Sequence, residues 1–322
     1  MRLFIFICLL SALSLSTSGQ SERQLLPSDI KQQTIVTEPV TLSRGFFRAG
    51  MMMSYAVMDK YFDQEGNKRY YLNSTWGSSA SYLLKIQYGI SPRLMVDINL
   101  PVNASRQQFS GITIQPENNI DAAETSNLRG IGIGDGSLEF AYQIISEKKQ
   151  KISLTGSLQI KIPTGEKNPT NIRSLREYNL PSGSGFWSAG TRISARAILY
   201  PWSVTAYAGY INKFSGKKLL SPSDITETEF RDGFTFEAGG SFNLHLNDWI
   251  VNANHIEYLY KGRGKILEPY NITVDPVSAL YYETRLVFQV GQLRIGESVK
   301  IPIIGKRIAA DPRFEMLIQY VF

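Results

Sequence analysis

Most of the chain alternates apolar and polar residues with a period of two, and the C-terminus shows this pattern clearly. One face of the last ten residues carries only apolar side chains: Phe314, Met316, Ile318, Tyr320 and Phe322. The opposite face carries the polar residues Arg313, Glu315 and Gln319. Because successive side chains point to opposite sides of a strand, this spacing predicts a β-strand with one apolar and one wetter face.

About twelve segments of this two-faced kind follow residue 45, and no helical pattern of useful length accompanies them. Strands are predicted at 46–58, 82–90, 94–102, 137–144, 152–162, 192–199, 203–212, 234–246, 249–260, 280–290, 293–304 and 313–322. The alternation is poor in the segment that begins at Trp249, so we expect a β-bulge near 252–255.

The connections between these strands alternate strictly between short turns and long loops. Short turns are predicted at 91–92, 146–150, 201–202, 247–248 and 291–292, and long loops at 61–78, 104–129, 163–184, 214–229 and 261–276, with a shorter one at 306–311. An up-and-down outer-membrane barrel has short periplasmic turns and longer external loops, whereas a Greek-key sandwich would mix the two lengths. We therefore predict an all-β fold, a transmembrane antiparallel up-and-down β-barrel of about twelve strands over 45–322.

Aromatic residues cluster where such strands would meet the two membrane interfaces. Near the predicted periplasmic ends lie Tyr200, Trp202, Trp249, Tyr320 and Phe322. Near the external ends lie Trp76, Phe186, Trp187, Phe234, Tyr258 and Tyr260. Two aromatic girdles are typical of transmembrane barrels.

The N-terminus has the three parts of a secretory signal peptide, predicted at 1–19: a basic start, an apolar run from Leu3 to Leu13, and small residues up to Gly19. Segment 20–44 is expected either to lie in the periplasm or to plug part of the barrel. The one cysteine, Cys8, falls inside the signal, so the mature chain has no thiol for a disulfide or a cysteine nucleophile. These features predict a multi-pass protein of the bacterial outer membrane.

The formal net charge is +6, but the basic residues are spread along strands and loops rather than gathered in a stripe, which disfavours nucleic-acid binding. Charges at alternating positions are expected to face the barrel interior, because a basic residue facing lipid near the midplane would cost about 2–4 kcal/mol. The candidates for lining or constricting the lumen are Glu139, Lys161, Arg192, Arg196, Glu237, Glu283 and Arg285. Lys85, Asp97, Arg313 and Glu315 are expected on the same inner face.

Three short motifs between about residues 80 and 200 resemble one known family. They are Tyr88-Gly89-Ile90 followed by 94–101, Gly132-Ile133-Gly134-Asp135, and Lys161-Ile162-Pro163-Thr164-Gly165. The chain resembles the outer-membrane proteins named for the meta-pathway of phenol degradation, which are described as transporters. The resemblance implies passage of small hydrophobic or aromatic molecules across the outer membrane. We predict a channel that works by passive diffusion, without a cofactor and without catalysis.

Two other functions are alternatives to transport. An outer-membrane hydrolase would need a Ser–His pair, but the two histidines, His245 and His255, lack the sequence setting of the barrel phospholipases and both are expected in the periplasmic half. The acidic residues near Asp121 lack a metal-ligand spacing, so no metal site is predicted. A structural or surface-binding barrel that acts through its external loops is the remaining alternative.

The chain ends on an aromatic residue, and the pair Tyr320 and Phe322 resembles the sorting signal that the barrel assembly machinery reads in outer-membrane proteins. The expected partners are therefore this machinery, outer-membrane lipids and a small hydrophobic solute. The terminal strand is expected to close the barrel against the strand that begins near Phe46.

Overall fold

The computed structural model describes residues 41–42, 44–71, 76–111, 124–146, 151–174, 177–219, 224–247, 249–267 and 271–322. The predicted signal peptide and most of segment 20–44 lie outside the described residues. So do parts of the predicted connections near 72–75, 112–123 and 147–150.

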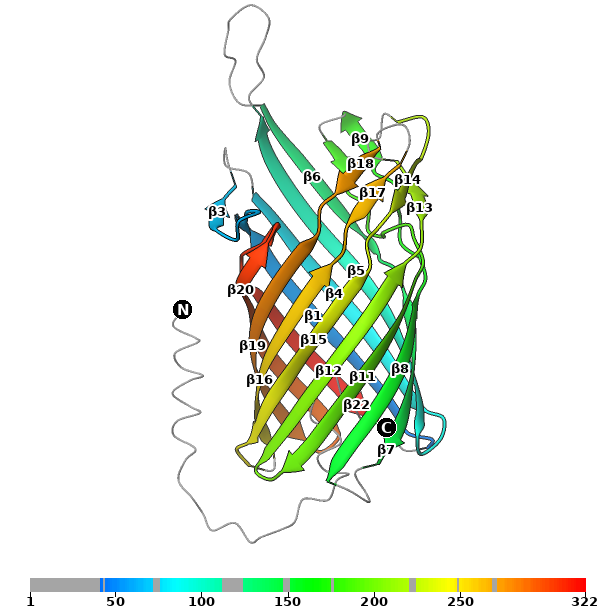
Figure 1. The fold of residues 1–322 in the computed structure, drawn as a ribbon, viewed down its shortest axis with the longest axis vertical. Coiled ribbons are helices and arrows are strands. Elements are labelled where there is room, and N and C mark those ends of the chain that lie inside the picture. The colour runs from blue at the N-terminus through cyan, green and yellow to red at the C-terminus, as the bar shows by residue number, and fades with distance from the viewer. Residues whose placement is uncertain are drawn as a thin grey trace, which may run out of the picture. The chain divides into compact units, whose positions relative to one another are not determined.

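The described strands form one closed antiparallel barrel of twelve strands, as predicted (Figure 1). Its strands, in ring order, are β1 (Phe47–Met58), β4 (Trp76–Gly89), β5 (Leu94–Gly111), β7 (Ser137–Ile145), β8 (Ile152–Lys161), β11 (Ser188–Leu199), β12 (Trp202–Lys213), β15 (Thr235–His245), β16 (Ile250–Lys261), β19 (Val277–Val290), β20 (Leu293–Lys306) and β22 (Arg313–Val321). Each pairs with its neighbour in the chain, and β6 (Glu124–Ile133) continues β7 along the outer part of β5. We name the two ends of the barrel the turn end and the loop end, after their connections.

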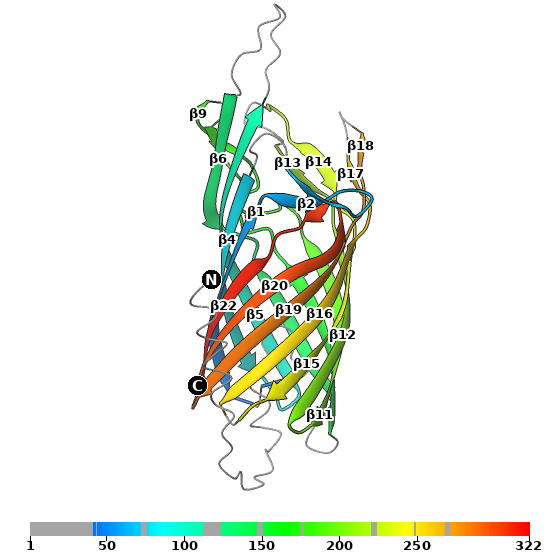
Figure 2. The same cartoon turned by 90° about the vertical axis from the view of Figure 1, so that its left-hand side faces the viewer.

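The ring closes where β1 pairs with β22, in a register that runs from Arg48 opposite Val321 to Ala56 opposite Arg313 (Figure 2). At the turn end the amide of Phe322 donates to the carbonyl oxygen of Phe47 at 2.8 Å, and the two rings lie 5.6 Å apart. The predicted pairing of the terminal strand with the first strand is confirmed.

The two faces of the barrel wall differ sharply in polarity. Inward residues such as Asp97, Arg196 and Arg294 are almost completely buried, whereas outward residues such as Ile193 and Trp249 are about half exposed. Soluble proteins bury their apolar side chains, so this inverted arrangement fits a wall that faces lipid outside and polar groups inside. The fold is that of bacterial outer-membrane proteins, which cross the membrane many times. Among the described residues there is no helix long and apolar enough to span a membrane.

Several predicted loops contain strands beyond the barrel wall (Figure 1). One small sheet joins β13 (Gly216–Lys218), β14 (Thr228–Arg231), β17 (Gly264–Ile266) and β18 (Ile272–Val274), and another joins β2 (Lys60–Phe62), β3 (Lys68–Tyr70) and β21 (Ile308–Ala309). The short strand β10 (Glu177–Asn179) pairs with β6 on one side and with β9 (Thr170–Ser174) on the other. The loops predicted at 61–78, 104–129, 163–184, 214–229 and 261–276 are therefore partly wrong, because strands beyond the membrane lose the apolar face that identifies the others.

The bulge predicted near 252–255 is also wrong, because β16 pairs with both neighbours without a register shift there. The alternation fails for a different reason. Asn252 and Asn254 occupy outward positions and satisfy each other, with Asn254 Nδ2 donating to Asn252 Oδ1 at 2.7 Å. The hydroxyl of Tyr282 on β19 donates to Asn254 Oδ1 at 2.7 Å. These hydrogen bonds allow the two asparagines to lie on the otherwise apolar outer face.

Deleting Phe322 should impair barrel assembly, because it removes the ring that lies against Phe47 and the amide that closes the seam. An aromatic pair contributes about 1 kcal/mol beyond its buried area. We expect a several-fold smaller share of the protein to reach the compact, heat-modifiable form in outer-membrane fractions run unheated on SDS gels. Phe314→Ala, which removes an outward ring from the same strand, is the control, and normal insertion of the truncated chain would contradict the prediction.

Candidate functional site

All seven predicted lumen residues lie at inward positions of their strands. Glu139 is on β7, Lys161 on β8, Arg192 and Arg196 on β11, Glu237 on β15, and Glu283 and Arg285 on β19. The structure divides them into separate groups along the wall.

Arg192 and Glu237 form the first group. The Nε of Arg192 donates to Oε1 of Glu237 at 2.8 Å across β12, and Glu139 lies close enough to act on Arg192 electrostatically. Gly209 on β12 sits between them, and a Cβ on this residue would lie 2.8 Å from Oε1 of Glu237. Because glycine has no side chain, the Arg192 and Glu237 side chains can approach each other across β12.

Tyr207, His255, Glu257 and Lys300 form a second group at mid-height. The rings of Tyr207 and His255 are parallel with centroids 5.6 Å apart, and the Tyr207 hydroxyl donates to Oε2 of Glu257 at 3.1 Å. Lys300 Nζ lies 3.1 Å from the same oxygen. The guanidinium of Arg192 lies 5.5 Å from the Tyr207 ring, which joins this group to the first.

The aromatic stack depends on Gly239 of β15. A Cβ on Gly239 would lie 2.8 Å from Cε1 of Tyr207 and 2.6 Å from the carbonyl oxygen of Ile256. With glycine there, the tyrosine ring lies directly against the wall.

Sequence reasoning missed this second group apart from His255, which we placed nearer the turn end than it is. Glu257 lies on β16, whose poor alternation in the sequence does not reveal an inner face. The prediction for 203–212 assigned no inner face, so it did not identify Tyr207. The signal was available in the strict period of β12, where every odd-numbered residue is inward.

Arg285 forms a third group with two carboxylates. Its Nη2 lies 2.5 Å from Oε1 of Glu283 and 3.2 Å from Oε2 of Glu315, and all three side chains are about nine-tenths buried. Lys85 makes a similar pair on the other side of the seam, 2.8 Å from Oδ2 of Asp97. Charges along the middle of the wall are thus matched by opposite charges.

Arg196 lies nearer the turn end than Arg192 and acts electrostatically on His245. Arg48 and Arg294 are also inward at this end, and all three are at most 3% exposed.

The chain just before β1 lies inside the barrel at the turn end. The Thr41 hydroxyl lies 3.3 Å from the Pro92 carbonyl oxygen and 3.3 Å from Oε1 of Gln143. Leu42 is buried with Met95 and Ala141, which are inward residues of β5 and β7. Two residues of segment 20–44 thus occupy part of the interior.

Two of the motifs behind the family resemblance meet where β6 passes into β7. Thr164 donates to the Gly134 carbonyl oxygen at 2.9 Å and accepts the Gly136 amide at 2.8 Å. Asp135 is buried and lies 3.0 Å from Lys161 Nζ. The residues that suggested the family therefore build one junction in the barrel wall.

No family model matches the chain. Among solved structures, it is similar to the COG4313 outer membrane channel from Pseudomonas putida F1, with a TM-score of 0.69 and 13% identity over 90% of this chain and 100% of that one. It also aligns with a mutant of the monoaromatic hydrocarbon channel TodX (TM-score 0.46, 10% identity, 87% of this chain and 90% of that one). The translocator domain of the autotransporter NalP from Neisseria meningitidis aligns at TM-score 0.46 and 8% identity over 92% of both chains. At these identities the first likeness shows a shared barrel fold.

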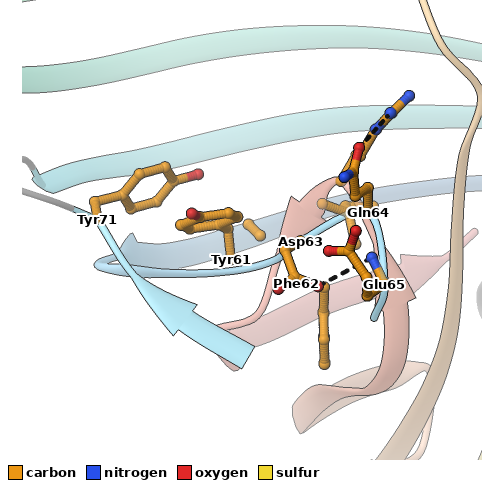
Figure 3. A pocket seen from close by; sticks show the side chains of 9 residues that line it. Tyr61, Phe62, Asp63, Gln64, Glu65 and Tyr71 are labelled. Atoms are coloured by element: carbon orange, nitrogen blue, oxygen red, sulfur yellow. Dashed lines mark hydrogen bonds between the residues drawn. The ribbon is translucent and has the colours of Figure 1, made fainter. Parts of the chain in front are cut away.

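The loop end carries a cavity of about 470 Å³ outside the barrel wall (Figure 3). The rings of Tyr61 and Tyr71 lie 4.9 Å apart on one side of it. Partial desolvation would raise the pKa of Asp63, but hydrogen bonds from the Asn67 amide and from Arg69 outweigh this and lower it. Arg307 also lines the cavity, and its Nη2 donates a hydrogen bond to Oε1 of Gln64 at 3.2 Å.

Among the described residues, neither histidine has the partner that a serine hydrolase requires. A nucleophilic serine must lie within hydrogen-bond reach of its base. His255 Nε2 lies 3.3 Å from the Tyr207 hydroxyl instead, and both ring nitrogens of His245 are buried without a hydrogen-bond partner among the described residues. In the part of the chain that the structure describes, no group of three potential metal-ligating side chains occurs.

Gly239→Ala should destabilise the barrel, because its methyl group would collide with Tyr207 and with backbone. Overpacking of this kind costs about 1–3 kcal/mol. Gly296→Ala is the matched control, since Gly296 is also an inward strand glycine but has no atom closer than 3.6 Å to the added carbon. Urea unfolding in lipid vesicles should show a lower midpoint for Gly239→Ala alone, and equal midpoints for the two variants would contradict this account.

Proposed function

We propose that the protein is an outer-membrane channel through which small molecules, hydrophobic or aromatic in character, pass by diffusion. The observation that carries the proposal is the wall itself, with an apolar exterior and an interior of matched charges. Barrels of about eight strands are filled by side chains, and those of sixteen or more leave an aqueous channel. A barrel of twelve strands lies between these cases, so its inward side chains control what fits.

The preference for aromatic solutes is supported by the family resemblance. The Tyr207 ring lies against the wall at mid-height, next to the Arg192 guanidinium. Because this ring is only 6% exposed and is stacked on His255, a planar solute can stack on it only by displacing a neighbouring side chain. The known channel with which the chain shares its fold is consistent with this proposal.

Arg192→Ala should make the channel more selective for cations, because it leaves Glu237 and Glu139 without their positive neighbour. The double variant Arg192→Ala/Glu237→Ala removes one charge of each sign and should return selectivity close to that of the wild type. Reversal potentials of planar bilayers under a KCl gradient measure this. Permeability that is unchanged for a broad panel of ions and small solutes, in protein shown to be folded, would overturn the channel proposal.

Substrate preference needs its own measurement, because small aromatic molecules also cross lipid directly. An aromatic solute that binds in the lumen should lower the ionic current, so benzyl alcohol should block more strongly than glycerol at equal concentration. Tyr207→Leu should weaken this block. Equal block by both solutes would argue against an aromatic preference while leaving the channel intact.

Replacing Thr41 and Leu42 by glycine should raise the single-channel conductance, because both side chains occupy the interior at the turn end. Phe46→Gly, an exposed position just before β1, is the control. A conductance that stays at the wild-type value would show that these residues leave the narrowest part of the path unaffected.

Binding through the loops is the second candidate function, and the cavity beside Tyr61 and Tyr71 favours it. Its volume lies within the range of small-molecule sites, about 300–1,000 Å³. Replacing Tyr61 and Tyr71 by alanine should abolish binding of a small molecule in this cavity but leave the conductance of the barrel unchanged. The two measurements therefore distinguish loop binding from channel function.

A further inference from the structure

Three lysines end three strands of the barrel at the same rim. Lys161 ends β8, Lys213 ends β12 and Lys261 ends β16, and each occupies an inward position. Lys161 and Lys213 both pair with Ser188 of the strand between them, which places them two strands apart, about 10 Å, on one face. Lys261 follows two strands further on, at the loop end of the lumen.

Two aspartates hold these lysines in place. Asp232 bridges two of them, with Oδ2 at 2.6 Å from Lys213 Nζ and Oδ1 at 2.7 Å from Lys261 Nζ. Asp135 holds Lys161 at 3.0 Å. A fourth ammonium group, that of Lys218, lies 4.8 Å from the Phe230 ring and is close enough to feel the charge of Asp232.

The cluster carries more positive than negative charge, in contrast to the matched pairs lower in the wall. Four lysines against two aspartates leave a net charge of +2. Burial alone would raise the pKa of Asp232, but hydrogen bonds and charges from Lys213 and Lys261 lower it, so its carboxylate stays ionised. Burial lowers the pKa of Lys218, and the charge of Asp232 offsets this only in part.

The existing contacts show which ligand fits. Asp232 is itself a carboxylate whose two oxygens each take one ammonium group. A carboxylate on a solute has the same charge and the same oxygen spacing, so it can share or replace this bridge while Lys161 and Lys218 supply further charge. The Phe230 ring beside Lys218 offers an apolar surface next to the charges.

We propose that this lysine cluster binds small organic carboxylates at the loop-end mouth of the lumen. It thereby adds an anionic group to the substrate class inferred above. If the protein is the channel proposed above, carboxylates bound at this mouth would enter the lumen, and this part of the inference rests on the proposed channel function. Binding of carboxylates to the lysine cluster does not depend on it.

Equilibrium binding to the full chain in detergent tests the proposal without a membrane. Benzoate is the probe, benzyl alcohol its neutral analogue and inorganic phosphate the second anion. We expect benzoate to bind more tightly than benzyl alcohol and to lose affinity as ionic strength rises. Lys213→Gln/Lys261→Gln should weaken benzoate binding about tenfold or more, since two charge-assisted contacts are lost.

The control removes equal charge from the same end of the barrel. Lys217→Gln/Lys265→Gln changes two exposed lysines of β13 and β17 that lie outside the inward row, and it should leave benzoate binding unchanged. Asp232→Asn should act in the opposite direction and tighten binding, because it frees two ammonium groups. Heat-modifiable mobility establishes that each variant is folded.

Three results would overturn the assignment: equal affinity for benzoate and benzyl alcohol, equal effects of the two double-lysine variants, or phosphate binding as tightly as benzoate. A protein that binds benzoate as expected but conducts nothing would refute the channel proposal and leave the carboxylate site standing.

Discussion

The structure depends on pairing every backbone hydrogen bond in the wall, because lipid offers no alternative partner. Twelve antiparallel strands satisfy this only if the first and last strands also pair, and the seam between β1 and β22 completes the ring. The amide of Phe322 extends that pairing to the last residue of the chain. Closure removes the free edges that would otherwise be exposed in lipid, and it fixes which side of every strand faces inward.

Closure in lipid also forces the polar half of each strand into a confined interior, where charges need partners. The barrel meets this need with local pairs such as Arg192 with Glu237 and Arg285 with Glu283. Glycine makes some of these contacts possible, since Gly209 and Gly239 leave room that any side chain would fill. The interior is therefore a packed polar wall whose opening is set by side chains.

The loop end follows a different rule. There the strands leave the membrane, charge is no longer balanced pair by pair, and the rim of Lys161, Lys213 and Lys261 retains an excess of positive charge. Beyond it, short strands from different loops pair into small sheets, so the loops are ordered by one another (Figure 1). A mouth with an uncompensated charge and a balanced interior can attract a solute and then let it pass, which unites the two proposals made for this protein.

The sequence by itself determined the fold class, the strand count, the alternation of turns and loops, and the inward position of residues such as Arg192 and Glu283. It could do so because a strand in lipid must carry an apolar residue at every second position. That rule ends where lipid ends, so the strands beyond the membrane and the cluster around Asp232 became visible only in three dimensions. It also fails where outward polar groups pair with each other, as Asn252 and Asn254 do. Which charges meet depends on strand register and on gaps left by glycine, and only the tertiary structure decides these, because the partners lie tens of residues apart in the chain.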